Sequence, residues 1–137
     1  MGHRILPAAR VFASAAVLAV NLLTLPAAAQ TAGVTRTDLQ RHDLGAPSRE
    51  AVQVRVDLAP GVVFGRHTHP GEEIIYVLAG AIEYDVEGKP PVTLGAGDVL
   101  FIPAGTVHAA KNVGRETASE LATYIVAKDK PLLTPVK

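Results

Sequence analysis

Three histidines and one glutamate stand at spacings at which they could bind a single metal ion. His67 and His69 are two residues apart, and an i, i+2 pair on a β-strand points both side chains to the same face. Glu73 follows a Pro-Gly dipeptide that breaks the strand, so its own strand can fold back over that face. His108 offers a fourth donor much later in the chain. We therefore predict a metal site formed by His67, His69, Glu73 and His108.

This set of donors indicates a reactive site rather than a closed structural one. Three imidazoles and one carboxylate leave one or two positions of a divalent ion open for water, dioxygen or substrate. The set suits iron, manganese, nickel, copper or zinc, so the predicted cofactor is one divalent transition metal of undetermined identity. The chain contains no cysteine, and its single methionine is Met1. Thiolate metal sites and cysteine nucleophiles are thereby excluded.

The elements that must position these residues read as strands, and no segment reads as a convincing helix. Residues 51–58 alternate apolar and polar side chains, which is typical of a half-buried strand. Glycine and proline interrupt the chain every eight to twelve residues or so. We expect strands at residues 38–44, 51–58, 62–69, 73–78, 81–86, 92–94, 99–102, 107–112 and 121–127. Many short strands of this kind predict an all-β sandwich or barrel.

Two motifs then resemble those of the cupin superfamily. In the first, gaps of five, one, three and six residues separate Gly61, His67, His69, Glu73 and Gly80. In the second, gaps of five, one, two and three residues separate Gly97, Pro103, Gly105, His108 and Asn112. The resemblance implies a small single-domain jelly-roll barrel with one metal bound inside by the four predicted ligands. It does not decide the activity, since cupins include dioxygenases, decarboxylases, isomerases and proteins without catalysis.

The amino-terminal segment is predicted to be a secretory signal at residues 1–29. Arg4 and Arg10 precede a largely apolar stretch at residues 11–25, and small residues at Ala27 and Ala29 fit signal peptidase. An uncleaved membrane anchor is the alternative. Cleavage after Ala29 would leave a periplasmic or secreted protein with no stable membrane insertion. The remaining chain divides into an arm at 30–50, a barrel at 51–127 and a tail at 128–137.

Charge and composition limit the partners. Removal of the signal takes away two arginines and no acidic residue, which leaves 11 basic residues against 13 acidic ones. No basic patch for nucleic acid follows from this balance. The expected partner is a small-molecule ligand or substrate. A homodimer is also compatible with the sequence, and the alternating strand at 51–58 offers a surface for it.

Other residue types near the motifs have structural interpretations. Only one of Glu72 and Glu73 can point inward on a strand, and the spacing favours Glu73. His42 is expected at the surface. The aromatic side chains are expected in the core more often than at a substrate: Phe64, Tyr76, Tyr84 and Phe101. No separate acid or base is expected inside the barrel.

Two classes of function fit these predictions. The first is a metal-dependent dioxygenase acting on a small organic, for example phenolic, molecule. Glu73 would be its catalytic residue, both ligating the metal and shuttling a proton, which is the role that the resemblance to flavonol-cleaving cupins implies. The second class is a non-catalytic periplasmic binding or sensing module that uses the same metal site.

Overall fold

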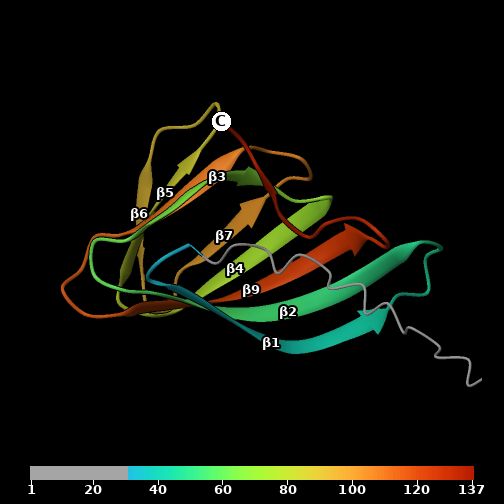
Figure 1. The fold of residues 1–137 in the computed structure, drawn as a ribbon, viewed down its shortest axis with the longest axis horizontal. Coiled ribbons are helices and arrows are strands. Elements are labelled where there is room, and N and C mark those ends of the chain that lie inside the picture. Colours follow the sequence, from blue (N-terminus) through green and yellow to red (C-terminus); the bar gives the residue numbers. More distant parts are fainter. Residues whose placement is uncertain (1–30) are drawn as a thin grey trace, which may run out of the picture.

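The computed structural model describes residues 31–137, and it confirms the all-β prediction. Within these residues the strands form two five-stranded antiparallel sheets that face each other as a jelly roll (Figure 1). The larger sheet has the order β1-β2-β9-β4-β7 and the smaller one β10-β3-β8-β5-β6. The strands are β1 (Val34–Asp43), β2 (Arg49–Leu58), β3 (Val63–Thr68), β4 (Gly71–Ala79), β5 (Ala81–Val86), β6 (Val92–Gly95), β7 (Val99–Ile102), β8 (His108–Asn112), β9 (Ala118–Ala127) and β10 (Thr134–Pro135).

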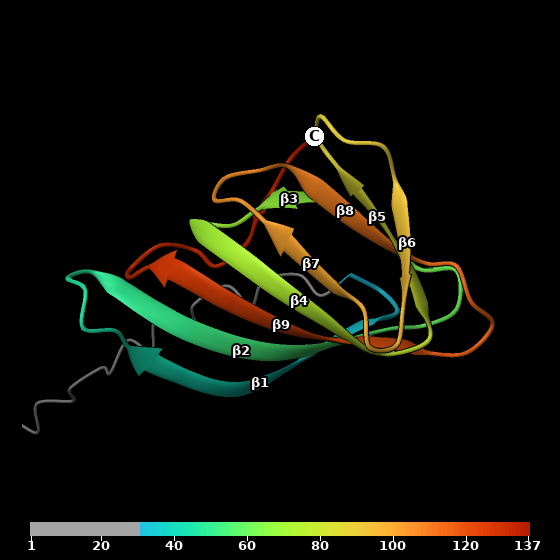
Figure 2. The same cartoon turned by 180° about the vertical axis from the view of Figure 1, so that it is seen from behind.

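The core lies between the two sheets and follows from the alternation of side chains along the strands. On β2 the even-numbered positions from Val52 to Leu58 are buried, while the odd-numbered ones are half-buried or exposed. β9 pairs with β2 along its whole length and buries the corresponding positions on its inner face. Strands β5 and β8 of the smaller sheet, seen from behind in Figure 2, close the core from the other side.

Several strands extend beyond the predicted ranges. β1 begins at Val34, four residues before the expected strand, and β9 begins at Ala118 rather than at residue 121. β4 begins at Gly71, which passes so close to β9 that a Cβ there would lie 2.1 Å from the carbonyl oxygen of Ile125. Two residues of the expected tail form β10 and pair with β3. The predicted signal at 1–29 lies outside the described residues.

Two motif residues shape the connections rather than the chemistry. Gly80 joins β4 to β5 with a φ of 77°, a left-handed conformation that favours glycine. Asn112 is fully buried, and its amide donates to the carbonyl oxygens of Leu58 and Glu116 at 2.9 and 2.8 Å. Its own side-chain oxygen accepts from the backbone N–H of Gly114. Asn112 therefore ties the loop before β9 to the end of β2.

The outer face of the larger sheet carries apolar side chains over β4 and β7. Ile74 lies opposite Phe101, and Tyr76 lies opposite Val99. All four side chains are about half exposed or more. The expectation of a core position was therefore wrong for Tyr76 and Phe101. Among the described residues, no helix is long and apolar enough to cross a membrane.

Candidate metal centre

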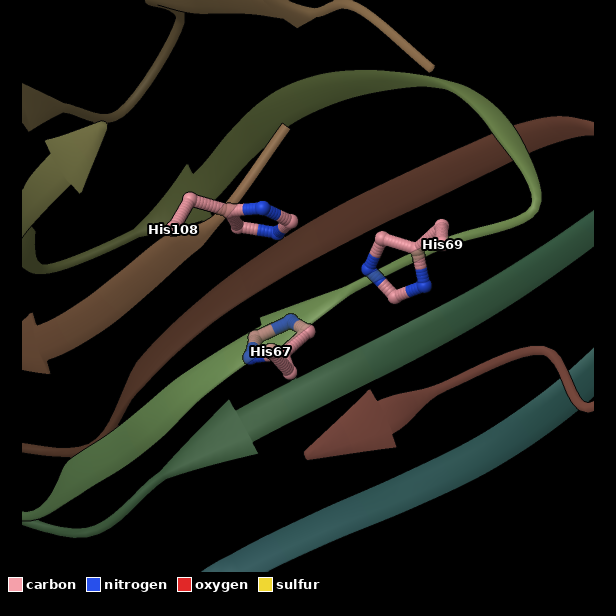
Figure 3. Close-up of side chains that lie close together, drawn as sticks. All are labelled: His67, His69 and His108. Carbon is pink, nitrogen blue, oxygen red and sulfur yellow. The ribbon is translucent and has the colours of Figure 1, made fainter. Parts of the chain in front are cut away.

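The three histidines converge at one end of the space between the sheets. His67 on β3 and His108 on β8 are direct cross-strand partners, and their ring centroids are 4.3 Å apart. His69 follows immediately after β3, where the chain turns toward β4. One nitrogen of each imidazole lies within 4.8 Å of the others, and the three rings face a common region in Figure 3. All three side chains are buried.

The orientation of each imidazole is fixed by a backbone carbonyl behind it. Nδ1 of His67 lies 2.6 Å from the carbonyl oxygen of Gly65, and Nδ1 of His108 lies 2.9 Å from that of Thr106. Nδ1 of His69 lies 2.5 Å from the carbonyl oxygen of Leu132, which belongs to the carboxy-terminal tail. A proton held on Nδ1 leaves Nε2 as a free electron-pair donor. Outer hydrogen bonds of this kind are typical of metal-binding histidines.

Glu73 reaches the same region from the opposite sheet. It lies on β4 opposite Tyr124 of β9, and its side chain is buried. Its Oε2 is 3.0 Å from Nε2 of His108 and 3.4 Å from Nε2 of His69. Within residues 31–137, these three atoms have no hydrogen-bond partner of acceptable geometry although they are fully buried. The structure thus brings together all four residues that the sequence singled out.

In the metal-free protein the electrostatics of the site favour the cation-binding form of His67 and Glu73, whereas His108 is shifted toward its protonated form. Burial, together with the neighbouring imidazoles, lowers the pKa of His67 to about 4, so this ring is neutral near pH 7. Burial alone would raise the pKa of Glu73, but the imidazoles of His108 and His69 outweigh it and hold that pKa below its usual range. Burial would likewise lower the pKa of His108, yet the Glu73 carboxylate raises it.

These observations fit a metal ion better than a purely structural cluster. Buried polar atoms in folded proteins nearly always have partners, and here the unpartnered ones are an acidic oxygen and two imidazole nitrogens aimed at one region. Borderline nitrogen and hard oxygen donors are what first-row divalent ions prefer. The triad of His67, His69 and His108 is consistent with a single metal ion, and Glu73 would complete its ligands.

A second carboxyl lies beside the site, contrary to the expectation that the barrel would hold no separate acid or base. Glu120 of β9 is buried and accepts a hydrogen bond from the hydroxyl of Tyr84 on β5. Burial and the nearby Glu73 carboxylate raise the pKa of Glu120 to about 8. Burial and the Glu120 carboxyl raise the pKa of Tyr84 above its usual range. At neutral pH this pair therefore holds its protons.

The sequence contained a signal for Glu120, but the predicted strand was too short to include this residue. The inner face of β9 carries Ala118, Glu120, Ala122, Tyr124 and Val126, all buried. The strand was expected to begin at residue 121, which left Glu120 outside it. Extension of the alternation by one step toward the amino terminus would have placed this carboxyl on the inner face.

The remaining candidate residues lie outside the cluster, with one exception. Glu72 is partly exposed and pairs with Arg49 at 2.5 Å, and His42 is exposed on β1. Tyr84 is in the core as expected. Phe64 is the exception: it is partly buried and stacks on His67 with ring centroids 4.6 Å apart. Phe64 therefore forms part of the wall of the metal site.

The space beside the ligands is small. A cavity of about 10 Å³ is bounded by Phe64, His67, Glu73, Ile75, Tyr84, His108, Ala110 and Glu120. A cavity of this size holds about one water molecule. The enclosed centre can thus accommodate an ion or a water, whereas an organic molecule needs additional room.

Comparison with known proteins agrees with this architecture. The dimethylsulfoniopropionate lyase DddQ of Ruegeria pomeroyi is 43% identical over 60 residues, which are 44% of this chain and 30% of that protein. In its crystal structure the match has a TM-score of 0.57 at 30% identity and covers 63% of this chain and 43% of that one. An oxalate-binding protein of Thermotoga maritima is 40% identical over 73 residues, covering 53% of this chain and 60% of that protein.

More distant structures share the fold. A recombinant oxalate oxidase in complex with glycolate matches with a TM-score of 0.63 at 24% identity, covering 78% of this chain and 57% of the other. The chain spans about a third of the lyase and less than two thirds of the oxalate-binding protein. Residues 54–124, which include all four predicted metal ligands, match the family described as Cupin domain. With both sequence motifs, the two-sheet jelly roll and this match in agreement, the chain belongs to the cupin family.

Proposed function

We propose that this protein is an exported single-metal enzyme that acts on a small organic acid, with dioxygen-dependent oxidation as its reaction. The observation that carries the proposal is the convergence of three carbonyl-anchored imidazoles and one carboxylate whose inward atoms lack partners within the described residues. A bound first-row ion would supply Lewis acidity and open coordination positions for an acid and dioxygen. The names of relatives support an acid as ligand, since one binds oxalate and another is a lyase of a propionate derivative.

The protein side chains supply two groups that can handle protons. The carboxylate of Glu73 lies within the site at 3.0 Å from His108 and can accept a proton from a bound molecule. The hydrogen-bonded pair of Tyr84 and Glu120 borders the same cavity and holds a proton at neutral pH. Phe64 and Ile75 provide apolar wall that limits access of water. The site therefore combines a base, an acid and an apolar wall.

The reaction is tested by dioxygen uptake with matched variants. Wild type, Glu73→Gln and Glu72→Gln are each loaded to equal occupancy with iron, manganese, nickel or copper and offered a panel of phenolic, keto and dicarboxylic acids. Glu73→Gln should lower turnover by about 100-fold or more, because an amide can ligate weakly but cannot accept a proton. Glu72→Gln should retain turnover, since Glu72 lies at the rim and pairs with Arg49.

The same panel separates oxidation from two other outcomes. Product without dioxygen consumption would replace oxidation by elimination, which the similarity to a lyase favours as the second candidate. Tight binding of a panel member without turnover by any metal form would contradict an enzyme and favour the binding module. Export is tested separately by locating the protein in a periplasmic or secreted fraction of the source cells.

A further inference from the structure

A large groove adjoins the metal site on the side of β1 and the carboxy-terminal tail. It has a volume of about 560 Å³, which lies in the range of small-molecule sites. Phe64 and His67 line both this groove and the small cavity at the metal centre. A ligand in the groove would therefore lie against His67, one of the proposed metal ligands. The proposed function requires such a space, because the cavity itself has room for only about one water molecule.

Most of the groove wall is apolar. Val34 of β1 is buried, and Phe64, Leu132 and Leu133 are partly buried. These side chains come from both sheets and from the tail that also holds His69 through the carbonyl oxygen of Leu132. An apolar wall of this kind favours the hydrocarbon part of an organic molecule.

Arg36 is the cation that distinguishes this groove. On β1 it lies directly opposite Val56 of β2, and Val56 lies opposite Glu120 of β9. Residues in register on neighbouring strands project from the same face of a sheet. Since Val56 and Glu120 are buried on the inner face, Arg36 also projects from this face, where the groove lies.

Arg36 has no ion-pair partner within residues 31–137, although its charge is close enough to Glu120 to lower the pKa of that carboxyl against the effect of burial. Its side chain is half-buried, and it forms no ion pair or side-chain hydrogen bond with any residue of 31–137. Asp38 also borders the groove, but it is exposed and lies beyond ion-pair distance. Arg66, the other arginine of the groove, pairs with Glu87 at 3.2 Å. A guanidinium that is partly desolvated gains most from a carboxylate that it can bind with two N–H groups.

We propose that this groove binds a monocarboxylate beside the metal centre. Arg36 binds the carboxylate, and the apolar wall contacts the hydrocarbon part of the molecule. The assignment rests on the proposed function for the role of the ligand as substrate. It names Arg36 as a substrate-binding residue outside both cupin motifs. Residues of β1 and the carboxy-terminal tail would then determine the specificity for an anion with an apolar hydrocarbon part.

The test compares benzoate with benzamide, which has a similar shape but no charge. Each is titrated into the purified protein, metal-free and zinc-loaded, while amide chemical shifts report the site and the affinity. Benzoate should shift signals along β1 and the tail, and Arg36→Gln should weaken it by about tenfold or more. Arg115→Gln should change the affinity less than about twofold, because that arginine is exposed and lies outside the groove lining. Benzamide should bind wild type and both variants alike.

The results that overturn the proposal are distinct from those that overturn the proposed function. Three results would each reject the monocarboxylate site. Benzoate could bind wild type and Arg36→Gln equally, or its shifts could be confined to the apolar face of β4 and β7. Sedimentation could also show a self-associated protein in which the groove is closed. Arg36→Lys, which keeps the charge, should retain part of the affinity and guards against misfolding of the glutamine variant. If wild type fails to bind metal while benzoate still depends on Arg36, the metal enzyme is wrong and the groove stands.

Discussion

Replacement of Glu120 by glutamine should change how the stability of the metal-free protein depends on pH. Burial and the Glu73 carboxylate raise the pKa of Glu120 from 4.5 to about 8 in the folded state. Between these two pH values the folded state binds the proton and the unfolded state releases it. The stabilisation is therefore complete below pH 4.5 and is lost as the pH rises to 8 and beyond. Glutamine stays neutral throughout and can still accept the hydrogen bond from Tyr84.

The magnitude follows from the size of the shift. Each pKa unit corresponds to about 1.4 kcal/mol, so ionisation of Glu120 costs on the order of 5 kcal/mol when complete. Between pH 6 and pH 8 the wild type should lose roughly 2 to 3 kcal/mol through this group alone. With a urea dependence of about 1 kcal/mol per molar, the midpoint of wild type should fall by about 2 M relative to Glu120→Gln.

The assay is urea unfolding of both proteins at pH 6, 7 and 8 in the presence of a chelator. The chelator is necessary because a cation at the neighbouring site would favour the ionised form of Glu120. The imidazole of His67 titrates in both proteins, so its contribution cancels in the comparison. The Glu120 carboxylate raises the pKa of His108, so this coupling contributes to the difference between the two profiles. Parallel pH profiles for wild type and Glu120→Gln would refute the argument and show that Glu120 is not held protonated by its surroundings.

Three further predictions concern the metal, the fold and the amino terminus. His108→Ala should weaken metal binding by at least roughly 100-fold, because one imidazole is lost from the centre, and elemental analysis should find the purified variant depleted of metal. The control His42→Ala, at an exposed position, should keep full occupancy. Unchanged occupancy in His108→Ala would contradict the site. Asn112→Ala should lower the free energy of unfolding by about 2 to 4 kcal/mol, since buried partners lose their hydrogen bonds, and Lys111→Ala, an exposed neighbour, should change it by less than about 0.5 kcal/mol. Mass spectrometry of the exported protein should find Gln30 as its first residue, and an intact 137-residue chain in a membrane fraction would show an anchor instead.

Local sequence was sufficient to predict the fold class and the four residues that meet at the candidate centre. Strand alternation placed His67 and His69 on one face because side chains on a strand repeat every two residues. Fixed gaps around glycine and proline constrained Glu73 and His108, and the structure brings all four together. Local patterns of this kind determine on which side of its own strand a residue projects, whereas His108 meets His67 through the pairing of β8 with β3, which the resemblance to cupins implied.

Other features depend on which strands become neighbours, and short-range sequence patterns do not determine strand pairing. Glu120 reaches the site because β9 lies at the centre of the larger sheet, between β2 and β4. Arg36 faces the groove because β1 pairs in register with β2, in a segment expected to be a polar arm. Leu132 orients His69 from 63 residues away. The candidate ligands could be identified from the sequence, whereas their surroundings depend on pairing between distant segments, whose register is set by burial of the whole inner face.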